Sequence, residues 1–195
     1  MKIIEMVIDE NDQDSGIDAV SLVEDPAIQL NFVALNKQNK VELAEVDQEK
    51  RILMGAALVP NKPIYRNQGG EEFYIYFTQK TVRRASELFF KRGYQNNVTE
   101  DHAIALDNNT VVESWIKEDE VHDKSVKFGL EAPIGTWLIS MKIEDEETYK
   151  KAKDGTLKGF SIEGFFADAL TVQQSKEKPA PVEAIKKMLS QIKTD

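Results

Sequence analysis

The stretch KGFSIEGFF, from Lys158 to Phe166, combines a β-strand pattern with one serine and two glycines. Side chains of a strand alternate between its two faces, so Phe160 and Ile162 lie on one face, and Ser161 and Glu163 lie on the other. The pattern predicts a strand that buries an apolar pair and presents a small hydroxyl on the opposite face. By itself the segment fits an ordinary core strand better than a catalytic one.

Gly159 and Gly164 flank this serine and carry no side chain where most strands would have one. Missing bulk in a strand marks a β-bulge or the close approach of another backbone. The two glycines therefore predict a bulge or a close backbone contact beside Ser161.

Composition favours a soluble, acidic, cytosolic protein. The chain has 195 residues, 41% of them hydrophobic, which suits one domain with a tail. Its 25 basic and 34 acidic residues give a net charge of −9, which argues against nucleic acid as the main partner. The absence of cysteine excludes disulfides, zinc–thiolate sites and cysteine nucleophiles. No apolar run approaches the ~20 residues that span a bilayer, and Glu5 comes too early for a signal peptide, so no membrane partner is expected.

The apolar runs predict about eight or nine short strands and two internal helices. One helix is expected between an N-cap at Thr78 and a C′ residue at Gly93, and the other over residues 144–154, with acids in its first turn and lysines in its last. Residues 36–50 are expected to be a loop or a weak helix, and residues 60–70 and 117–129 are expected to be mainly loops. The predicted strands cover residues 2–8, 19–23, 30–35, 51–59, 73–77, 98–106, 110–116, 135–143 and 158–166.

This succession of elements predicts an α+β fold, a β-rich, barrel-like domain with a few flanking helices, over residues 1–172. Residues 173–195 are predicted to be a Lys/Pro/Ala linker followed by an amphipathic C-terminal helix. The apolar stripe of that helix fits packing on its own domain and binding to a partner equally well.

The chain has two histidines, and they have different surroundings. His122 lies in the charged loop 117–129, where a solvated histidine is the simplest interpretation. His102 leads into the apolar run 103–106, which places it on a predicted strand. A serine hydroxyl is a poor nucleophile at neutral pH, and a neighbouring neutral imidazole can take its proton. The sequence thus offers Ser161 and His102 as a candidate pair.

A carboxylate usually orients such a base, and several are candidates. If residues 98–106 and 110–116 form a hairpin with Asn108-Asn109 as a two-residue loop, Glu113 lies diagonally from His102 on the same face. A three-residue loop puts Ser114 opposite His102 instead and sends Glu113 to the other face. Glu100 and Asp168 are the remaining candidates.

Several segments together resemble the XkdF-like phage serine proteases, a family within the prohead maturation proteases. The similarity extends over about residues 18 to 167, with the blocks in the same order. The segments that carry it are Val20–Ile28, Met54–Arg66, Asn97–His102, Val112–Ile116, Gly135–Trp137 and Lys158–Phe165.

The resemblance implies a serine endopeptidase related in fold to herpesvirus assemblin, without a cofactor or metal. It implies that Ser161 is the nucleophile and His102 the general base, with Glu113 as the expected orienting group. Backbone N–H groups near Gly159 or Gly164 are candidate oxyanion donors. The implied substrates are phage scaffold and major capsid proteins, cut in the host cytoplasm inside the immature capsid. The family also allows a homo-oligomer and cleavage of the enzyme's own tail.

Two other classes fit the same residues. A non-catalytic β-domain acting in capsid or scaffold assembly would keep the fold and show no contact between Ser161 and His102. A metal enzyme is less well supported because two histidines and no cysteine supply few borderline-soft ligands, although carboxylate sites for Mg²⁺ stay open.

Overall fold

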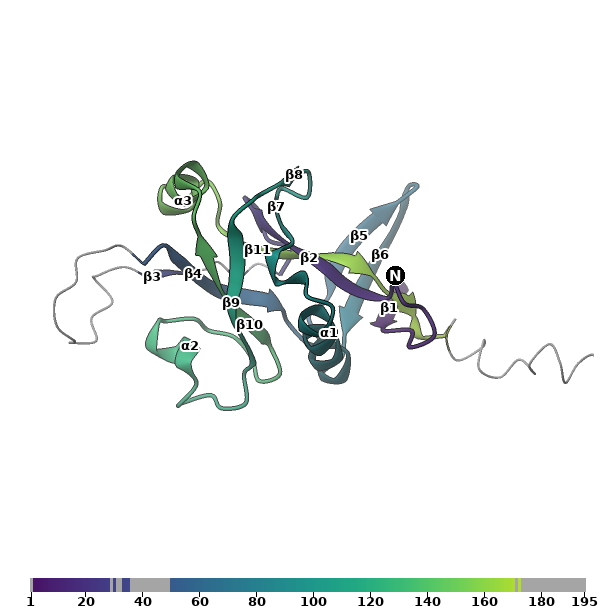
Figure 1. The fold of residues 1–195 in the computed structure, drawn as a ribbon. Coiled ribbons are helices and arrows are strands. Elements are labelled where there is room, and N and C mark those ends of the chain that lie inside the picture. The colour runs from purple at the N-terminus through teal and green to yellow at the C-terminus, as the bar shows by residue number, and fades with distance from the viewer. Residues whose placement is uncertain (1, 29, 31–32, 36–49, 171, 173–195) are drawn as a thin grey trace, which may run out of the picture.

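A computed structural model describes residues 2–28, 30, 33–35, 50–170 and 172 of the chain. Its strands form three four-stranded sheets, and in Figure 1 the sheet that contains β2 and β11 lies between the other two. The α+β, β-rich fold class is confirmed. None of the three sheets closes on itself, so the barrel-like form is not confirmed. The loop predicted within residues 36–49 and the linker and helix predicted over residues 173–195 lie outside the described residues.

The first sheet has the order β12-β1-β6-β5. Its strands are β1 (Lys2–Val7), β5 (Ile64–Gln68), β6 (Glu71–Phe77) and β12 (Ala167–Asp168). Strand β5 was not predicted from the sequence, which indicated a loop over residues 60–70. Only Ile64 of this edge strand is buried, so no apolar alternation marks it. Backbone pairing to β6 holds it, and Gly69 and Gly70, both with positive φ, make the tight turn between the two strands.

The second sheet has the order β3-β4-β10-β9. Its strands are β3 (Val33–Leu35), β4 (Ile52–Leu58), β9 (Asn109–Ile116) and β10 (Trp137–Ile143). Strands β4 and β10 are its two inner strands and are buried along almost their whole length, as their near-continuous apolar sequence predicts.

The third sheet has the order β11-β2-β7-β8 and carries the serine strand. Its strands are β2 (Gly16–Val23), β7 (Val98–Glu100), β8 (Ile104–Ala105) and β11 (Gly159–Phe165). Strand β11 is at the edge and pairs antiparallel with β2, which pairs in parallel with β7. The N-terminal strand β2 therefore separates the serine strand from the strand that leads to His102.

The predicted hairpin between residues 98–106 and 110–116 is wrong. Strand β7 folds back on the short β8 instead, and β9 pairs with β10 of another sheet. The segment 98–106 is interrupted because Asp101 and His102 both adopt positive φ, 47° and 58°. Such a backbone cannot continue a strand, and Asp and His are among the residues that adopt it most readily. His102 thus lies in a turn and not on a strand.

Both predicted helices are present. The first, α1 (Gln79–Lys91), begins after Thr78, whose hydroxyl accepts a hydrogen bond from the Thr81 N–H, and Gly93 just beyond it has φ 78°. The second, α3 (Glu146–Lys153), is capped by Asp145. Two further single-turn elements were not predicted. A 3₁₀ turn, η1 (Tyr94–Asn96), follows α1, and a short helix, α2 (Lys124–Lys127), interrupts the predicted loop 117–129. No helix in the described part of the chain is long and apolar enough to cross a membrane.

Helix α1 packs against strands of all three sheets and joins them into one core (Figure 1). Its fully buried Phe89 meets Trp137 of β10 edge to face, with ring centroids 5.5 Å apart. Edge-to-face pairs of this kind add about 0.5–1.5 kcal/mol to the burial of the rings.

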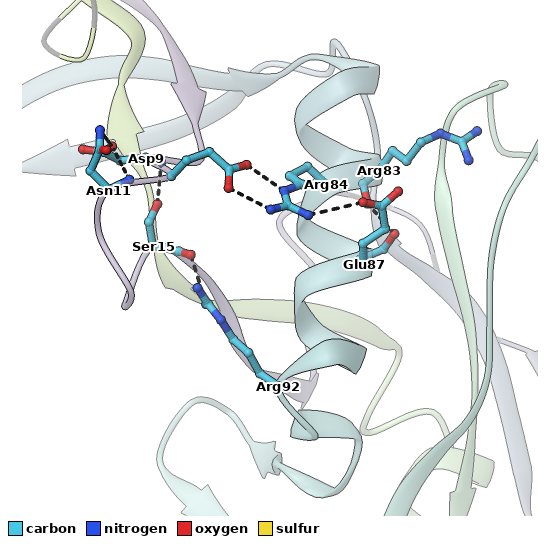
Figure 2. A network of polar contacts seen from close by, with 9 residues as sticks. Asp9, Asn11, Ser15, Arg83, Arg84, Glu87 and Arg92 are labelled. Carbon is cyan, nitrogen blue, oxygen red and sulfur yellow. Dashed lines mark hydrogen bonds and ion pairs between the residues drawn. The ribbon is translucent and has the colours of Figure 1, made fainter. Parts of the chain in front are cut away.

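The same helix also holds the turn that precedes β2 (Figure 2). Arg84 makes two parallel hydrogen bonds of 2.7 Å to the Glu10 carboxylate, and Arg92 donates to the Ser15 carbonyl at 3.0 Å. The Ser15 hydroxyl in turn donates to the carbonyl of Phe165, the last residue of β11. The end of the serine strand is therefore tied to α1 through the N-terminal turn.

Candidate active site

Three hydroxyl residues lie in one row across the third sheet. Ser161 of β11 is directly opposite Ser21 of β2, and Ser21 is directly opposite Thr99 of β7. Direct partners in neighbouring strands project from the same face of a sheet. Glu163, two residues along β11 from Ser161, shares that face at about 7 Å along the strand.

His102 reaches this face from the turn after β7. The Ala103 N–H donates to the Glu100 carbonyl at 3.0 Å and closes the turn, and both central residues, Asp101 and His102, have positive φ. The turn is fixed to β2 at two points: the Asp101 N–H donates to the Leu22 carbonyl, and the His102 N–H donates to the Ser21 hydroxyl, each at 3.0 Å.

The carboxylate that contacts His102 is Glu163. Nδ1 of His102 and Oε1 of Glu163 are 3.3 Å apart, and the Thr99 hydroxyl donates to the same carboxylate oxygen. The Glu163 side chain thus reaches across β2 toward β7. Its direct neighbour in β2 is Ala19, whose small side chain leaves room for this. A carboxylate this close to Nδ1 favours the neutral tautomer with its proton on Nδ1, in which Nε2 is free to accept one. This is the tautomer that a general base for serine requires.

Ser161 and His102 lie on the same face of the sheet without a direct hydrogen bond among the described residues. Their link is Ser21, which is opposite Ser161 in the sheet and bonded to the His102 backbone. Ser161 is half-buried, and the His102 side chain is 44% exposed. Catalytic hydrogen bonds often tighten only when substrate binds, so a catalytic serine and histidine need not be hydrogen-bonded in the free protein.

Glu113, the orienting group predicted from the sequence, is elsewhere. It lies on β9 of the second sheet and forms an ion pair with Lys124. Burial raises the pKa of the Glu113 carboxyl, but hydrogen bonds led by that of Lys124 outweigh burial and bring the pKa below its ordinary value. No contact of the described residues joins Glu113 to His102, because the hairpin that was expected to bring them together does not form.

The two alternative carboxylates are also engaged with other groups. Glu100 is buried and accepts a hydrogen bond from Nζ of Lys151 at 2.8 Å. Asp168 accepts one from the Leu170 N–H at 2.8 Å. Glu163 was not considered as a candidate, although the alternation of side chains along β11 already places it on the face of Ser161.

The second histidine agrees with its interpretation as a solvated residue. The side chain of His122 is 83% exposed, and its Nδ1 is 3.2 Å from Oδ2 of Asp119. Backbone hydrogen bonds from His122 and Val121, and the side-chain contact with His122, lower the pKa of Asp119 to about 2.

Both glycines of β11 are in close contact with backbone, as predicted. A Cβ on Gly164 would lie 2.0 Å from the Gly16 carbonyl oxygen, and one on Gly159 would lie 2.8 Å from the Leu30 carbonyl oxygen. At Gly164 the pairing with β2 skips Asp18, a β-bulge immediately after Glu163. The side-chain amide of Asn97 donates to the Asp18 carbonyl and satisfies the residue that the bulge leaves unpaired.

Ser161 also lines a cavity of about 430 Å³ between β11 and the first sheet. Most of the residues that line it are apolar, among them Met6, Ile28, Leu58, Ile75, Phe77 and Phe166. Its polar lining includes Arg66 and Gln68 of β5. The cavity has room for a substrate side chain beside the serine. Among the described residues, no group of three or more histidines and carboxylates could hold a metal ion.

A serine, a histidine and a carboxylate on one sheet face are the groups that serine hydrolases use for acyl transfer. Over residues 40–170 the chain matches the family described as "Putative phage serine protease XkdF". This match spans more than half of the chain, which therefore belongs to that family of phage serine proteases. No curated protein and no solved structure matches the chain.

Proposed function

We propose that this protein is a serine endopeptidase in which Ser161 is the nucleophile, His102 the general base and Glu163 the orienting carboxylate. The observation that carries the proposal is the 3.3 Å contact between His102 Nδ1 and Glu163 Oε1, on the sheet face that also holds Ser161. Family membership supports the reaction class, and the contact supports Glu163 in place of the predicted Glu113.

The reaction proceeds through an acyl-enzyme. Nε2 of His102 takes the proton from the Ser161 hydroxyl as Oγ attacks the carbonyl carbon of the scissile peptide bond. The imidazolium then gives this proton to the leaving amine as the carbon–nitrogen bond breaks. Water attacks the resulting ester with His102 again as base, which releases the second product and restores the serine. Glu163 holds the Nδ1 proton throughout and stabilises the imidazolium by its charge.

The proposed substrates are the scaffold and major capsid proteins of a phage, cut inside the immature capsid in the host cytoplasm. Relation to herpesvirus assemblin belongs to the same proposal. Support comes from the phage protease family and from the open cavity beside Ser161, which accommodates a side chain of an extended peptide.

A non-catalytic assembly domain is the second candidate. The observation in its favour is that Ser161 and His102 make no direct hydrogen bond among the described residues. The two functions differ in one measurable property, the reactivity of the Ser161 hydroxyl.

The deciding experiment treats the full-length protein with a fluorophosphonate probe and identifies the modified residue by mass spectrometry. We expect modification of Ser161 and its loss in His102→Ala, with strong slowing in Glu163→Gln. His122→Ala and Glu113→Gln are the matched controls and keep the reactivity of the wild type. Co-expression with scaffold and capsid proteins should yield defined fragments that Ser161→Ala does not produce. Unmodified Ser161 together with intact partner masses would support the assembly domain.

A further inference from the structure

The cavity beside Ser161 carries one cationic side chain, Arg66, among lining residues that are mostly apolar. Arg66 projects from β5, and the walls around it come from strands β1, β4, β6 and β11. Because Ser161 also lines this cavity, we expect a substrate whose scissile bond reaches Ser161 to place a neighbouring side chain within it.

Arg66 has no carboxylate partner among the described residues. Its guanidinium donates one hydrogen bond, to the Tyr65 carbonyl at 3.0 Å. Three of the other four arginines are paired with acids: Arg51 with Glu146, Arg83 with Glu118 and Arg84 with Glu10. Arg92 instead donates to the Ser15 carbonyl outside the cavity.

The surroundings of Arg66 leave most of its donors available. By accessible area the residue is exposed, yet burial lowers the pKa of its guanidinium. The exposure and the lowered pKa are both expected for a side chain that lines an open cavity, because solvent reaches the side chain while protein atoms surround it. A guanidinium has five N–H donors in a planar fork, which matches the two oxygens of a carboxylate.

We propose that Arg66 binds the carboxylate of an acidic substrate side chain and selects peptides that place Asp or Glu in this cavity. This proposal rests on the endopeptidase function and adds the class of substrate. The apolar walls contact the methylene groups of that side chain, and Gln68 supplies a further amide in the lining. A charge-assisted fork of this kind discriminates strongly against the uncharged amide, since Gln leaves donors of Arg66 without an acceptor.

The test uses peptides with acetylated and amidated ends, in which each position near a cleaved bond carries Glu in one set and Gln in the other. For wild type we expect one position at which Glu raises kcat/KM by about 10–100-fold over Gln. Arg66→Gln should reduce this ratio to about one, and Arg66→Glu should favour Lys at the same position. Arg83→Glu is the matched control, because it makes the same charge change on α1 and should keep the Glu preference.

A binding measurement separates this proposal from the endopeptidase function. Ser161→Ala binds peptide without cleaving it, so calorimetry with the Glu and Gln peptides reports recognition alone. Tighter binding of the Glu peptide, lost in Ser161→Ala/Arg66→Gln, supports the role of Arg66 whatever the turnover. Equal affinities and equal rates for Glu and Gln would overturn it, while modification of Ser161 by fluorophosphonate would still support the peptidase.

The source of the carboxylate is tested by one further peptide, which carries Gln at every position and a free C-terminus. Preference for this peptide over its amidated form, without a Glu preference, would assign Arg66 to a chain end and contradict the side-chain proposal. Circular dichroism of Arg66→Gln and Arg66→Glu checks that each variant folds.

Discussion

The backbone N–H of His102 donates a 3.0 Å hydrogen bond to the hydroxyl of Ser21, a residue 81 positions earlier in the chain. Ser21 is completely buried, and its hydroxyl donates onward to the Thr99 carbonyl at 3.4 Å. Since Ser21 is also the direct partner of Ser161 in the sheet, one small side chain links the proposed base to the proposed nucleophile.

Ser21→Ala should therefore impair catalysis, although Ser21 itself does not contact the substrate. We expect kcat to fall by about 10–100-fold with KM little changed, because a misplaced catalytic group costs rate more than affinity. Loss of the part-buried hydrogen bond from the His102 N–H should also destabilise the fold by about 0.5–1.5 kcal/mol. Peptide kinetics and urea unfolding measure the two effects separately. Ser86→Ala, which removes a hydroxyl bonded to the Arg83 carbonyl on α1, is the control. A loss of stability with unchanged kcat would make Ser21 purely structural.

Glu163→Gln and Glu113→Gln form a second, discriminating pair. Glu163→Gln removes the negative charge beside His102 Nδ1 that stabilises the imidazolium, and kcat should fall by about 10²–10⁴-fold. Glu113→Gln breaks only the partly exposed ion pair with Lys124, so stability should change by at most about 1 kcal/mol and kcat should be preserved. Fluorophosphonate labelling rates of Ser161 provide the measurement. The reverse order of effects would restore Glu113 as the orienting group.

Gly164→Ala should destabilise the protein severely. Its new Cβ would lie 2.0 Å from the Gly16 carbonyl oxygen, at φ 154°, so β11 would have to move away from β2. We expect a loss of at least about 4 kcal/mol or failure to fold. Gly155→Ala is the matched control: its φ is 82° but no atom lies within 4 Å, so only the backbone strain of about 1–2 kcal/mol applies. Urea unfolding compares the two variants, and similar losses would show that the bulge tolerates a side chain.

Acid should loosen the loop that contains His122. Asp119 accepts hydrogen bonds from the N–H groups of Val121 and His122, both at 2.7 Å, and its pKa is lowered to about 2. The contribution of a carboxylate with a lowered pKa is fully present above its unfolded value of about 3.9 and is lost as pH falls through the folded value. An NMR titration should show the Asp119 carboxyl and both amide protons changing together near pH 2. A midpoint near 4 would mean that these hydrogen bonds do not hold the loop.

The spacing of apolar residues predicted those strands and helices that bury apolar side chains. Strand β4 and helix α1 were found where their apolar patterns placed them, and the Thr78 cap marked the start of α1. Strand β5 could not be found in this way, because an exposed edge strand is held by its backbone and not by its side chains. The short helix α2 lacks the length for a periodic signal.

The sequence predicted part of the candidate site, because the alternation of side chains along a strand can be read from the sequence and the pairing of strands cannot. Strand alternation placed Ser161 and Glu163 on one face, and the structure agrees. The partner of His102 depends on which strands pair, and the sequence pattern predicts one continuous strand over residues 98–106. Two consecutive residues with positive φ, Asp101 and His102, break that strand, so β7 pairs with β8, and β9 pairs with β10 instead. Nothing in the sequence pattern indicates that the N-terminal strand β2 lies between the serine and the histidine.

The position of β2 between β11 and β7 has a consequence during synthesis. Ser21, His102 and Ser161 come from early, middle and late parts of the chain, so a ribosome must release all of β11 before the three can meet. A nascent or truncated chain that stops short of β11 contains the His102 turn but lacks Ser161, the proposed nucleophile. One that lacks β2 holds both reactive groups with no strand to align them. Under the proposed function, we therefore expect peptidase activity only in chains that have completed β11.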